Sequence, residues 1–279
     1  MSLSYHFTKR IFHAFGFIII AVLLVSGLTP EQVQAQDDEE PLYLVFEFMK
    51  VDNEQESAYA ETEQMWRSIH QERVKSGEII GWDLWSLQPG GEMQGYQYLT
   101  VTLFDDPAKM FGDPQMGDHA RAAYPDLSDE EISNKFSGTA ASRDLAERFY
   151  LEQIASTEGD FQMNVGTVAS IDFMKVKMDN YPAYEQSEME IFKPFHQQMI
   201  DNSEKGSWGL LRIMNPIGSD TYASHITVNM YENWQQVFSG QNSDSEPESS
   251  FSEDMMVQKG LETRDMKWVY MATLRDMVR

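Results

Sequence analysis

The tetrapeptide Phe48-Met49-Lys50-Val51 occurs a second time, as Phe173-Met174-Lys175-Val176, in the other half of the chain. The residues that follow each copy also match in order: Tyr59 with Tyr184, Glu63 with Glu188, His70 with His196, Trp82 with Trp208, Leu84 with Leu210, and Thr100-Val101 with Thr227-Val228. Self-similarity over such a length indicates a duplicated structural unit. The sequence therefore predicts two copies of one fold, in residues 36–160 and 161–279.

Both copies show the same order of predicted elements. In the first copy, alternating apolar residues predict strands over 42–51, 79–87, 96–104 and 149–154. Capping patterns place a helix over 53–75 and start a second one near Lys109. The second copy has its strands near 168–176, 207–213, 222–231 and 268–274. This order is ferredoxin-like (βαββαβ), an α+β unit in which two helices cover one face of an antiparallel sheet.

A ferredoxin-like unit leaves the other face of its sheet bare, and an apolar bare face must be buried against another element. The second copy on the same chain supplies that partner. In its duplication and its order of elements, the chain resembles the dimeric α/β-barrel superfamily. This superfamily includes antibiotic-biosynthesis-type monooxygenases, NIPSNAP-like proteins, and haem-degrading and haem-binding members. The resemblance implies that the two tandem repeats pack sheet to sheet as an intramolecular dimeric α/β barrel around a central cavity.

Residues 1–35 have the pattern of a secretory signal peptide. Lys9 and Arg10 precede an apolar run over 11–28, and Val33-Gln34-Ala35 has the form of a cleavage site. An uncleaved anchor is the alternative, since about 18 apolar residues can just span a bilayer. The pattern predicts a secreted or periplasmic protein with no stable membrane association after cleavage.

The composition excludes several classes of partner. The net charge is −24 at pH 7, and nucleic acids and anionic membranes attract Lys and Arg instead. The chain has no cysteine, so its stability must come from apolar cores rather than from disulfides. Oligomerisation stays open at this stage, because edge strands of each half can pair with another chain.

The third strand of each half predicts which side chains face the cavity. Leu99, Val101 and Leu103 alternate with Tyr98, Thr100 and Thr102, and Ile226, Val228 and Met230 alternate with His225, Thr227 and Asn229. We expect the apolar sets to lie under the helices and the polar sets to point into the cavity.

Four residues are candidate acid–base groups in such a cavity. Glu47 and Asp172 occupy matching positions on the first strand of each half, and His225 and Tyr98 lie on the third strands. Ionisable groups held together in a cavity can have pKa values suited to proton transfer. The alternative is a satisfied polar network with only a structural role.

Other residues predict ligand contacts. Trp82 and Trp208, on matching second strands, could bind a flat ligand, although core packing explains them as well. Arg212 could hold an anionic group. Arg143-Asp144 and Arg264-Asp265 precede the last strand of each half and predict a structural turn or ion pair.

His70 and His196 are candidate cofactor ligands, with haem as the cofactor. Each follows a large apolar residue, Trp66 or Phe192, by four positions on its helix. No second His or Cys stands at ligand spacing on either helix, which disfavours zinc or non-haem iron. A packed, hydrogen-bonded histidine is the alternative.

The sequence contains no phosphate-binding glycine loop, nucleophile elbow, HExxH or CxxC motif. We therefore favour a small-molecule-binding protein with a ligand, aromatic in character, between the two sheets. The alternatives are a cofactor-independent monooxygenase or isomerase, a haem-binding protein, and a structural or interaction protein. The sequence does not decide whether the chain is an enzyme.

Overall fold

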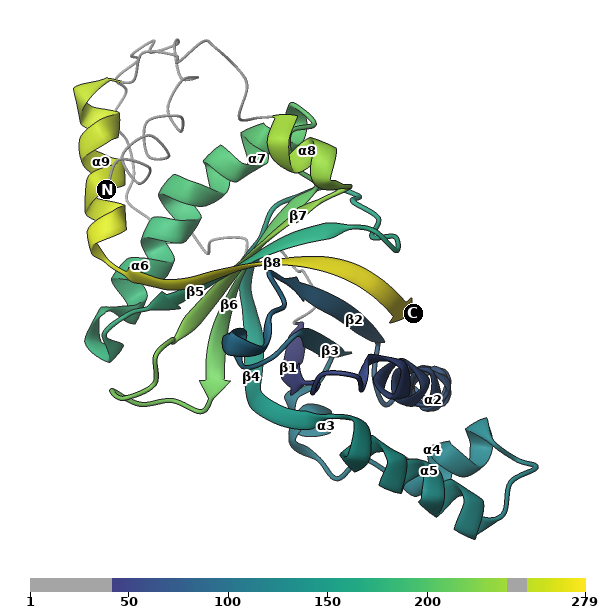
Figure 1. Cartoon of the computed structure of the whole chain (residues 1–279). Coiled ribbons are helices and arrows are strands. Elements are labelled where there is room, and N and C mark those ends of the chain that lie inside the picture. The colour runs from purple at the N-terminus through teal and green to yellow at the C-terminus, as the bar shows by residue number, and fades with distance from the viewer. Residues whose placement is uncertain (1–41, 240–249) are drawn as a thin grey trace, which may run out of the picture.

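The computed structural model describes residues 42–239 and 250–279, so the predicted signal peptide lies outside the described residues. Eight antiparallel strands form one closed barrel (Figure 1). Their order around the barrel is β1 (Tyr43–Lys50), β3 (Tyr98–Phe104), β2 (Gly81–Gln88), β8 (Asp265–Val278), β5 (Val168–Lys175), β7 (His225–Tyr231), β6 (Ser207–Asn215) and β4 (Asp144–Ser156), which pairs again with β1.

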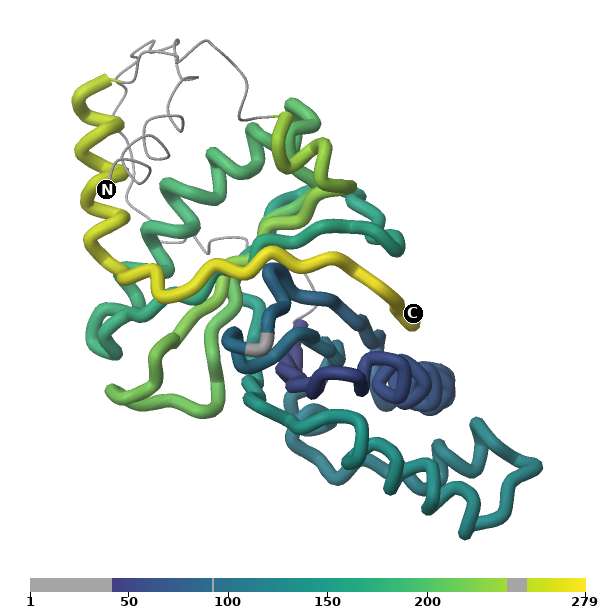
Figure 2. Tube along the Cα trace, in the orientation of Figure 1, coloured from purple at the N-terminus to yellow at the C-terminus, as the bar shows by residue number. Residues whose placement is uncertain are grey.

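Each half contributes four consecutive strands in the ferredoxin-like order, β4-β1-β3-β2 and β8-β5-β7-β6. The halves join where β2 pairs with β8 and β4 pairs with β6. Figure 2 shows β8, in yellow, crossing from its own half to end beside the first half. The predicted fold, a fused dimeric α/β barrel, is confirmed.

Helices cover the outside of the barrel, with those of the two halves on opposite sides (Figure 1). The first half has α2 (Glu56–Lys75), α3 (Pro107–Phe111), α4 (Met116–Ala123), α5 (Asp129–Ser142) and a short 3-10 turn, η2 (Glu92–Gln94). The second half has η3 (Met178–Asn180), α6 (Tyr181–Ser187), η4 (Glu188–Phe192), α7 (Lys193–Asp201), α8 (Trp234–Ser239) and α9 (Phe251–Glu262). None of the helices within 42–239 and 250–279 is long and apolar enough to cross a membrane.

The long helix of the second half differs from α2 by a π-helical turn, η4. One residue more separates Glu188 from His196 than separates Glu63 from His70. A π turn absorbs a single inserted residue without ending the helix. The matched residues therefore keep their places at both ends of the helix, although the spacing between them has changed.

The barrel interior is a packed apolar core. It is filled by Leu44, Phe46, Phe48, Trp85, Leu87, Leu99, Val101, Phe149, Leu151, Ala169, Ile171, Phe173, Leu211, Ile213, Ala223, Ile226, Tyr270, Ala272 and Leu274. At its centre the Phe48 ring lies 5.9 Å from that of Phe173 and 6.1 Å from that of Phe149, measured between centroids.

The predicted facing of the strands was therefore wrong. Leu99, Val101 and Ile226 point into the barrel, and Thr100 and Thr227, which alternate with them, lie on the outer face under the helices. An eight-stranded barrel is only wide enough for its own side chains, so apolar residues fill it. This core occupies the space between the sheets where the sequence predicted a cavity.

Candidate functional site

The outer face of each half carries the same buried set of tyrosine, glutamate and arginine. In the first half Arg143, at the end of α5, donates to Glu63 Oε1 at 2.5 Å, and the buried ring of Tyr59 lies one helical turn from Glu63. In the second half Arg264 Nε lies 3.4 Å from Glu188 Oε1. Each ion pair ties the start of the last strand to the first helix of its half. The sequence predicted a structural turn or ion pair at Arg143-Asp144 and Arg264-Asp265, but not these glutamate partners.

Burial perturbs the carboxyl groups of both sets. Burial raises the pKa of Glu63 to about 7, although Arg143 opposes the shift. The pKa of Glu188 is raised for the same reason, against the effect of Arg264. Glu63 therefore changes its charge near neutral pH.

Each predicted histidine stacks on the matched tryptophan. The centroid of the His70 ring lies 5.1 Å from that of Trp82, and His196 lies 5.1 Å from Trp208. Arg73 donates to His70 Nδ1 at 3.1 Å, and Lys205 donates to His196 Nδ1 at 2.7 Å. Burial and the neighbouring cation lower the pKa of both histidines. Both rings are therefore neutral and accept a hydrogen bond from the cation.

A cavity of about 270 Å³ opens on the outer face of the first half. We call it the α2–α5 cavity; it is lined by Glu47, Met49, Leu145 and Arg148 from the sheet and by Trp66, Phe136, Thr139, Ala140 and Arg143 from the helix side. The rings of Trp66 and Phe136 meet edge to face, 5.5 Å apart. Arg148 Nε donates to Glu47 at 2.8 Å across the cavity lining. The site thus combines an aromatic wall with two arginines and one carboxylate.

The matching place in the second half is filled. Phe192, the counterpart of Trp66, is buried and packs against Gly260, where an added Cβ would lie 2.9 Å from the ring. The guanidinium of Arg264 lies over the same ring, 4.4 Å from its centroid. Phe192 follows the inserted residue of η4, so the π turn and the filled site occur together.

Arg212 does not present a free cation to a ligand. Its guanidinium donates twice to Glu185, at 2.6 and 2.5 Å, and once to Glu152 at 2.8 Å. Glu185 also contacts His225 Nε2 at 2.9 Å, and Ser224 contacts His225 Nδ1. Burial alone would raise the pKa of Glu185, but the hydrogen bonds from His225 and Arg212 lower it to about 2. Arg212 therefore binds carboxylates of the protein itself, Glu185 and Glu152, where the sequence predicted an anionic ligand.

Asp172 belongs to a second buried network. It accepts hydrogen bonds from Ser170 and from Asn229 Nδ2, the latter at 3.0 Å. Lys205 donates to Asn229 Oδ1 at 2.7 Å and joins His196 to the network. Burial lowers the pKa of Lys205 to about 7, although the charge of Asp172 opposes this shift.

The four predicted acid–base residues do not share a cavity. Glu47 lines the α2–α5 cavity, whereas Tyr98 packs on Tyr59 with ring centroids 4.5 Å apart. Asp172 and His225 lie in the two networks of the second half. The predicted grouping was wrong because these side chains lie on the outer face, where the helices of different halves separate them. Their individual roles stay predictions.

Sequence reasoning missed most of the cavity lining. Trp66 was noted only as an apolar helix position, and Arg143 only as an ion-pair partner. Phe136 and Arg148 lie in segments with no distinctive motif. Within the described ranges, no group of three or more His, Cys, Asp or Glu is arranged to hold a metal ion.

No family model matches the chain, and no curated protein matches it. Its fold, the dimeric α/β barrel, is shared by solved structures that align with it. A candidate monooxygenase from Fusobacterium nucleatum subsp. nucleatum ATCC 25586 aligns with a TM-score of 0.53 at 10% identity, over 85% of this chain and 93% of that one.

Two other solved structures align over similar lengths. An anthrone oxidase-like protein has a TM-score of 0.51 at 10% identity, over 86% of this chain and 94% of its own. A heme-binding protein from Thermus thermophilus has a TM-score of 0.50 at 9% identity, over 85% and 92%. At such low identity these similarities establish the fold, and function must be argued from the site.

Proposed function

We propose that this chain binds a small aromatic molecule with an acidic group in the α2–α5 cavity. The observation that carries the proposal is the joint presence of the Trp66 and Phe136 rings and the guanidinium groups of Arg143 and Arg148 in one cavity. Ligand sites are mostly apolar, with a few polar groups that fix the ligand's orientation. A volume of about 270 Å³ suits a ligand of one or two rings.

Arg148 is the residue suited to hold the acidic group. Its side chain is 44% exposed and forms an ion pair with Glu47. A guanidinium has five donors and can bind a carboxylate through two of them. Arg143 already forms an ion pair with Glu63. Its contribution to the site is a cation–π contact with Trp66, in which the guanidinium carbon lies 5.9 Å from the ring centroid.

A titration with 1-naphthoate and 1-naphthol, followed by tryptophan fluorescence, tests this proposal. The two compounds share their rings and differ in the acidic group. We expect naphthoate to bind more tightly, Arg148→Ala to weaken naphthoate selectively, and Phe136→Ala to weaken both. Phe238→Ala, an exposed ring on α8, is the matched control. Unchanged binding of both compounds to Phe136→Ala would contradict the proposal.

Oxygenation of the bound ligand is the second candidate function. Two structural neighbours are named as a candidate monooxygenase and an anthrone oxidase-like protein, and Glu47 lines the cavity. A carboxylate there can accept a proton from a phenolic ligand, which would prepare an electron-rich ring for oxygen. Oxygen consumption that needs the phenol and is lost in Glu47→Gln would support catalysis, and its absence would leave binding alone.

Haem does not fit the histidines as they are arranged. Although one neighbour is named as heme-binding, His70 and His196 each stack on a tryptophan and accept a hydrogen bond from a cation. Neither residue lines the α2–α5 cavity. We expect no Soret shift when haem is added to the protein. A Soret band that is lost in His70→Ala or His196→Ala would reverse this conclusion.

We further propose that the protein is exported, with cleavage after Ala35. The basic residues, apolar run and small-residue site of 1–35 support the proposal. The mass of the protein recovered from its own cells, together with its cell fraction, tests it. A mature chain that begins at Gln36 outside the cytoplasm is expected, and a full-length chain in the membrane would favour the anchor instead.

A further inference from the structure

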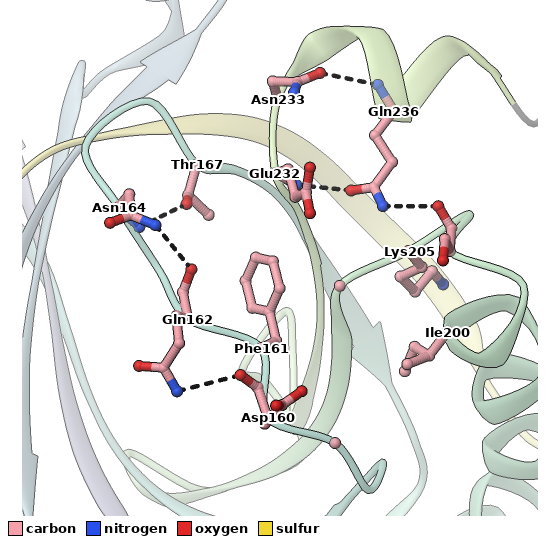
Figure 3. Close-up of a pocket in the computed structure, with 13 residues that line it drawn as sticks. Asp160, Phe161, Gln162, Asn164, Thr167, Ile200, Lys205, Glu232, Asn233 and Gln236 are labelled. Carbon is pink, nitrogen blue, oxygen red and sulfur yellow. Dashed lines mark hydrogen bonds between the residues drawn. The ribbon is translucent and has the colours of Figure 1, made fainter.

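A second and larger cavity, of about 590 Å³, lies on the second half at the segment that connects β4 to β5 (Figure 3). We call it the linker pocket. It is lined by residues of three segments: Gly159, Asp160, Phe161, Gln162, Asn164 and Thr167 of the connecting segment; Ile200 of α7 with Ser203, Lys205 and Gly206 of the turn before β6; and Glu232, Asn233 and Gln236 after β7. Three separate segments thus supply a wall that is rich in amide side chains.

Internal hydrogen bonds hold these amides in place. Gln236 Oε1 accepts from the backbone N–H of Glu232 at 2.7 Å, and its Nε2 donates to the Ser203 carbonyl at 3.0 Å. On the other wall, Asn164 Nδ2 donates to the Gln162 carbonyl and Gln162 Nε2 donates to the Asp160 carbonyl, both at 3.2 Å. These contacts, drawn as dashed lines in Figure 3, pre-orient the wall before any ligand arrives.

Several polar groups of the wall remain available to a ligand. Within the described residues, no partner is recorded for the carboxylates of Asp160 and Glu232, for Gln162 Oε1 or for Asn233 Nδ2. These groups include both acceptors and a donor. Lys205 brings no free positive charge, because its ammonium group is buried and bonded to His196 and Asn229.

One aromatic ring lies among these polar groups. Figure 3 places the Phe161 side chain in the middle of the pocket, between the amides of the connecting segment and Ile200. The ring lies directly against the backbone of Gly206, where an added Cβ would be only 2.3 Å from it. Glycine at this position leaves room for the ring beside the start of β6, and Phe161 as a whole is half-buried.

From these observations we infer that the linker pocket binds a neutral polyhydroxylated ligand, a saccharide. A sugar hydroxyl can both donate and accept hydrogen bonds. It can therefore bind an amide side chain, or bind a carboxylate and a neighbouring hydrogen-bond donor together. The C–H face of a sugar ring is apolar and suits an aromatic ring. The free carboxylates of Asp160 and Glu232 repel anionic ligands. This inference is independent of the proposed function, since the two cavities lie on different halves.

Saturation-transfer NMR on the mature protein tests the inference with four neutral probes: maltotetraose, cellotetraose, tetra-N-acetylchitotetraose and xylotetraose. We expect at least one probe to receive saturation at its ring protons. Gln162→Ala and Phe161→Ala should each weaken that probe by about threefold to tenfold, the range that follows from loss of one polar or stacking contact. Both residues are at least partly exposed, which limits any effect on folding.

Gln186→Ala, an exposed amide on α6, is the matched control and should leave the affinity unchanged. Gly206→Ala should act like Phe161→Ala, because the added methyl group displaces the ring. The inference is overturned if none of the four probes receives saturation at millimolar concentration, or if Gln162→Ala and Phe161→Ala bind as the wild type does. It is also overturned if putrescine binds and displaces the sugar, which would make the pocket a site for cationic amines.

Discussion

At the residue scale, the second half buries a lysine at a position where the first half buries an isoleucine. Lys205 stands where the first half has Ile79, since each precedes the matched tryptophan by three positions. Ile79 packs in an apolar cluster with Trp82, whereas Lys205 bonds to His196 and Asn229. Buried charges must be paired to be tolerated. Both histidines therefore accept a hydrogen bond from a basic side chain, but that side chain is Arg73 of α2 in the first half and Lys205, just before β6, in the second half.

The Glu63–Arg143 ion pair should be essential for stability. Arg143→Met leaves the carboxyl group of Glu63 buried without its cation. Well above pH 7, where this group is charged, breaking a buried pair in this way should cost about 3 kcal/mol. Urea unfolding of the mature protein measures this loss. Arg121→Met is the matched control, because Arg121 and the carboxylates that it pairs with are exposed, and exposed ion pairs contribute little to stability. Equal losses in both variants would refute a special role for the buried pair.

The pKa of Lys205 predicts how stability changes with pH. Burial lowers this pKa to about 7 from an ordinary value of 10.5, so between these values the unfolded chain binds the proton and the folded chain does not. The contribution of Lys205 to the free energy of unfolding should therefore rise as pH increases from 7 to 10.5, and be at its least favourable below 7. The test is to measure the unfolding midpoint of the wild type and of Lys205→Met at several pH values from 7 to 10.5. The increase expected for the wild type should be absent in the variant. An equal increase in the unfolding midpoint of the variant would show that Lys205 does not cause this pH dependence.

At the element scale, the π turn η4 distinguishes the two halves. It accommodates one inserted residue and places Phe192 against Gly260 of α9, where the first half has Trp66 beside an open cavity. π turns are costly and often occur near functional sites. Here the turn accompanies the closure of one of two equivalent sites, which leaves the α2–α5 cavity as the open member of the pair.

Two helical glycines provide a matched test of that closure. Gly260→Ala on α9 would bring a methyl group to within 2.9 Å of the Phe192 ring, and overpacking of this kind costs about 1–3 kcal/mol. Gly138→Ala on α5 meets nothing within 4 Å and should stabilise the protein by about 0.5–1 kcal/mol through helix propensity. The midpoint of thermal unfolding should therefore fall in Gly260→Ala and rise in Gly138→Ala. A stabilised Gly260→Ala would show that Phe192 moves freely.

At the scale of the whole molecule, closure of the barrel makes each half depend on the other. The inner faces of the two sheets form one apolar core, and the edge strands pair as β2 with β8 and β4 with β6. The described strands therefore leave no free edge, so the strand pairing that we considered as a route to oligomers is already used within the chain. A contact between helices or loops would be needed for further assembly.

This dependence predicts the behaviour of the separated halves. Residues 36–160 or 161–279 alone would expose the apolar face of one sheet and two unpaired edges. Each half should be found as a dimer or an aggregate, and co-expression of the two should restore a 1:1 complex. Light scattering after size-exclusion chromatography measures these masses. A folded, monomeric half would show that the barrel core is not required.

The sequence by itself determined the duplication, the order of elements and hence the barrel, because matched residues and hydrophobic periodicity are local properties of the chain. It also showed that Arg143 matches Arg264 and that His70 matches His196 in the two halves. Those residues recur in both halves, and repetition is visible without a structure.

The tertiary structure alone decided which face of each sheet is inside and where a ligand can bind. Alternation along β1 or β3 defines two faces but does not say which one is enclosed, and in β1 both faces carry apolar side chains. Only closure of the barrel, which leaves room for no more than its own side chains, placed the apolar set inside. The polar residues were thereby moved under the helices, and the cavities formed where helices and loops from distant parts of the sequence fail to fill the outer face.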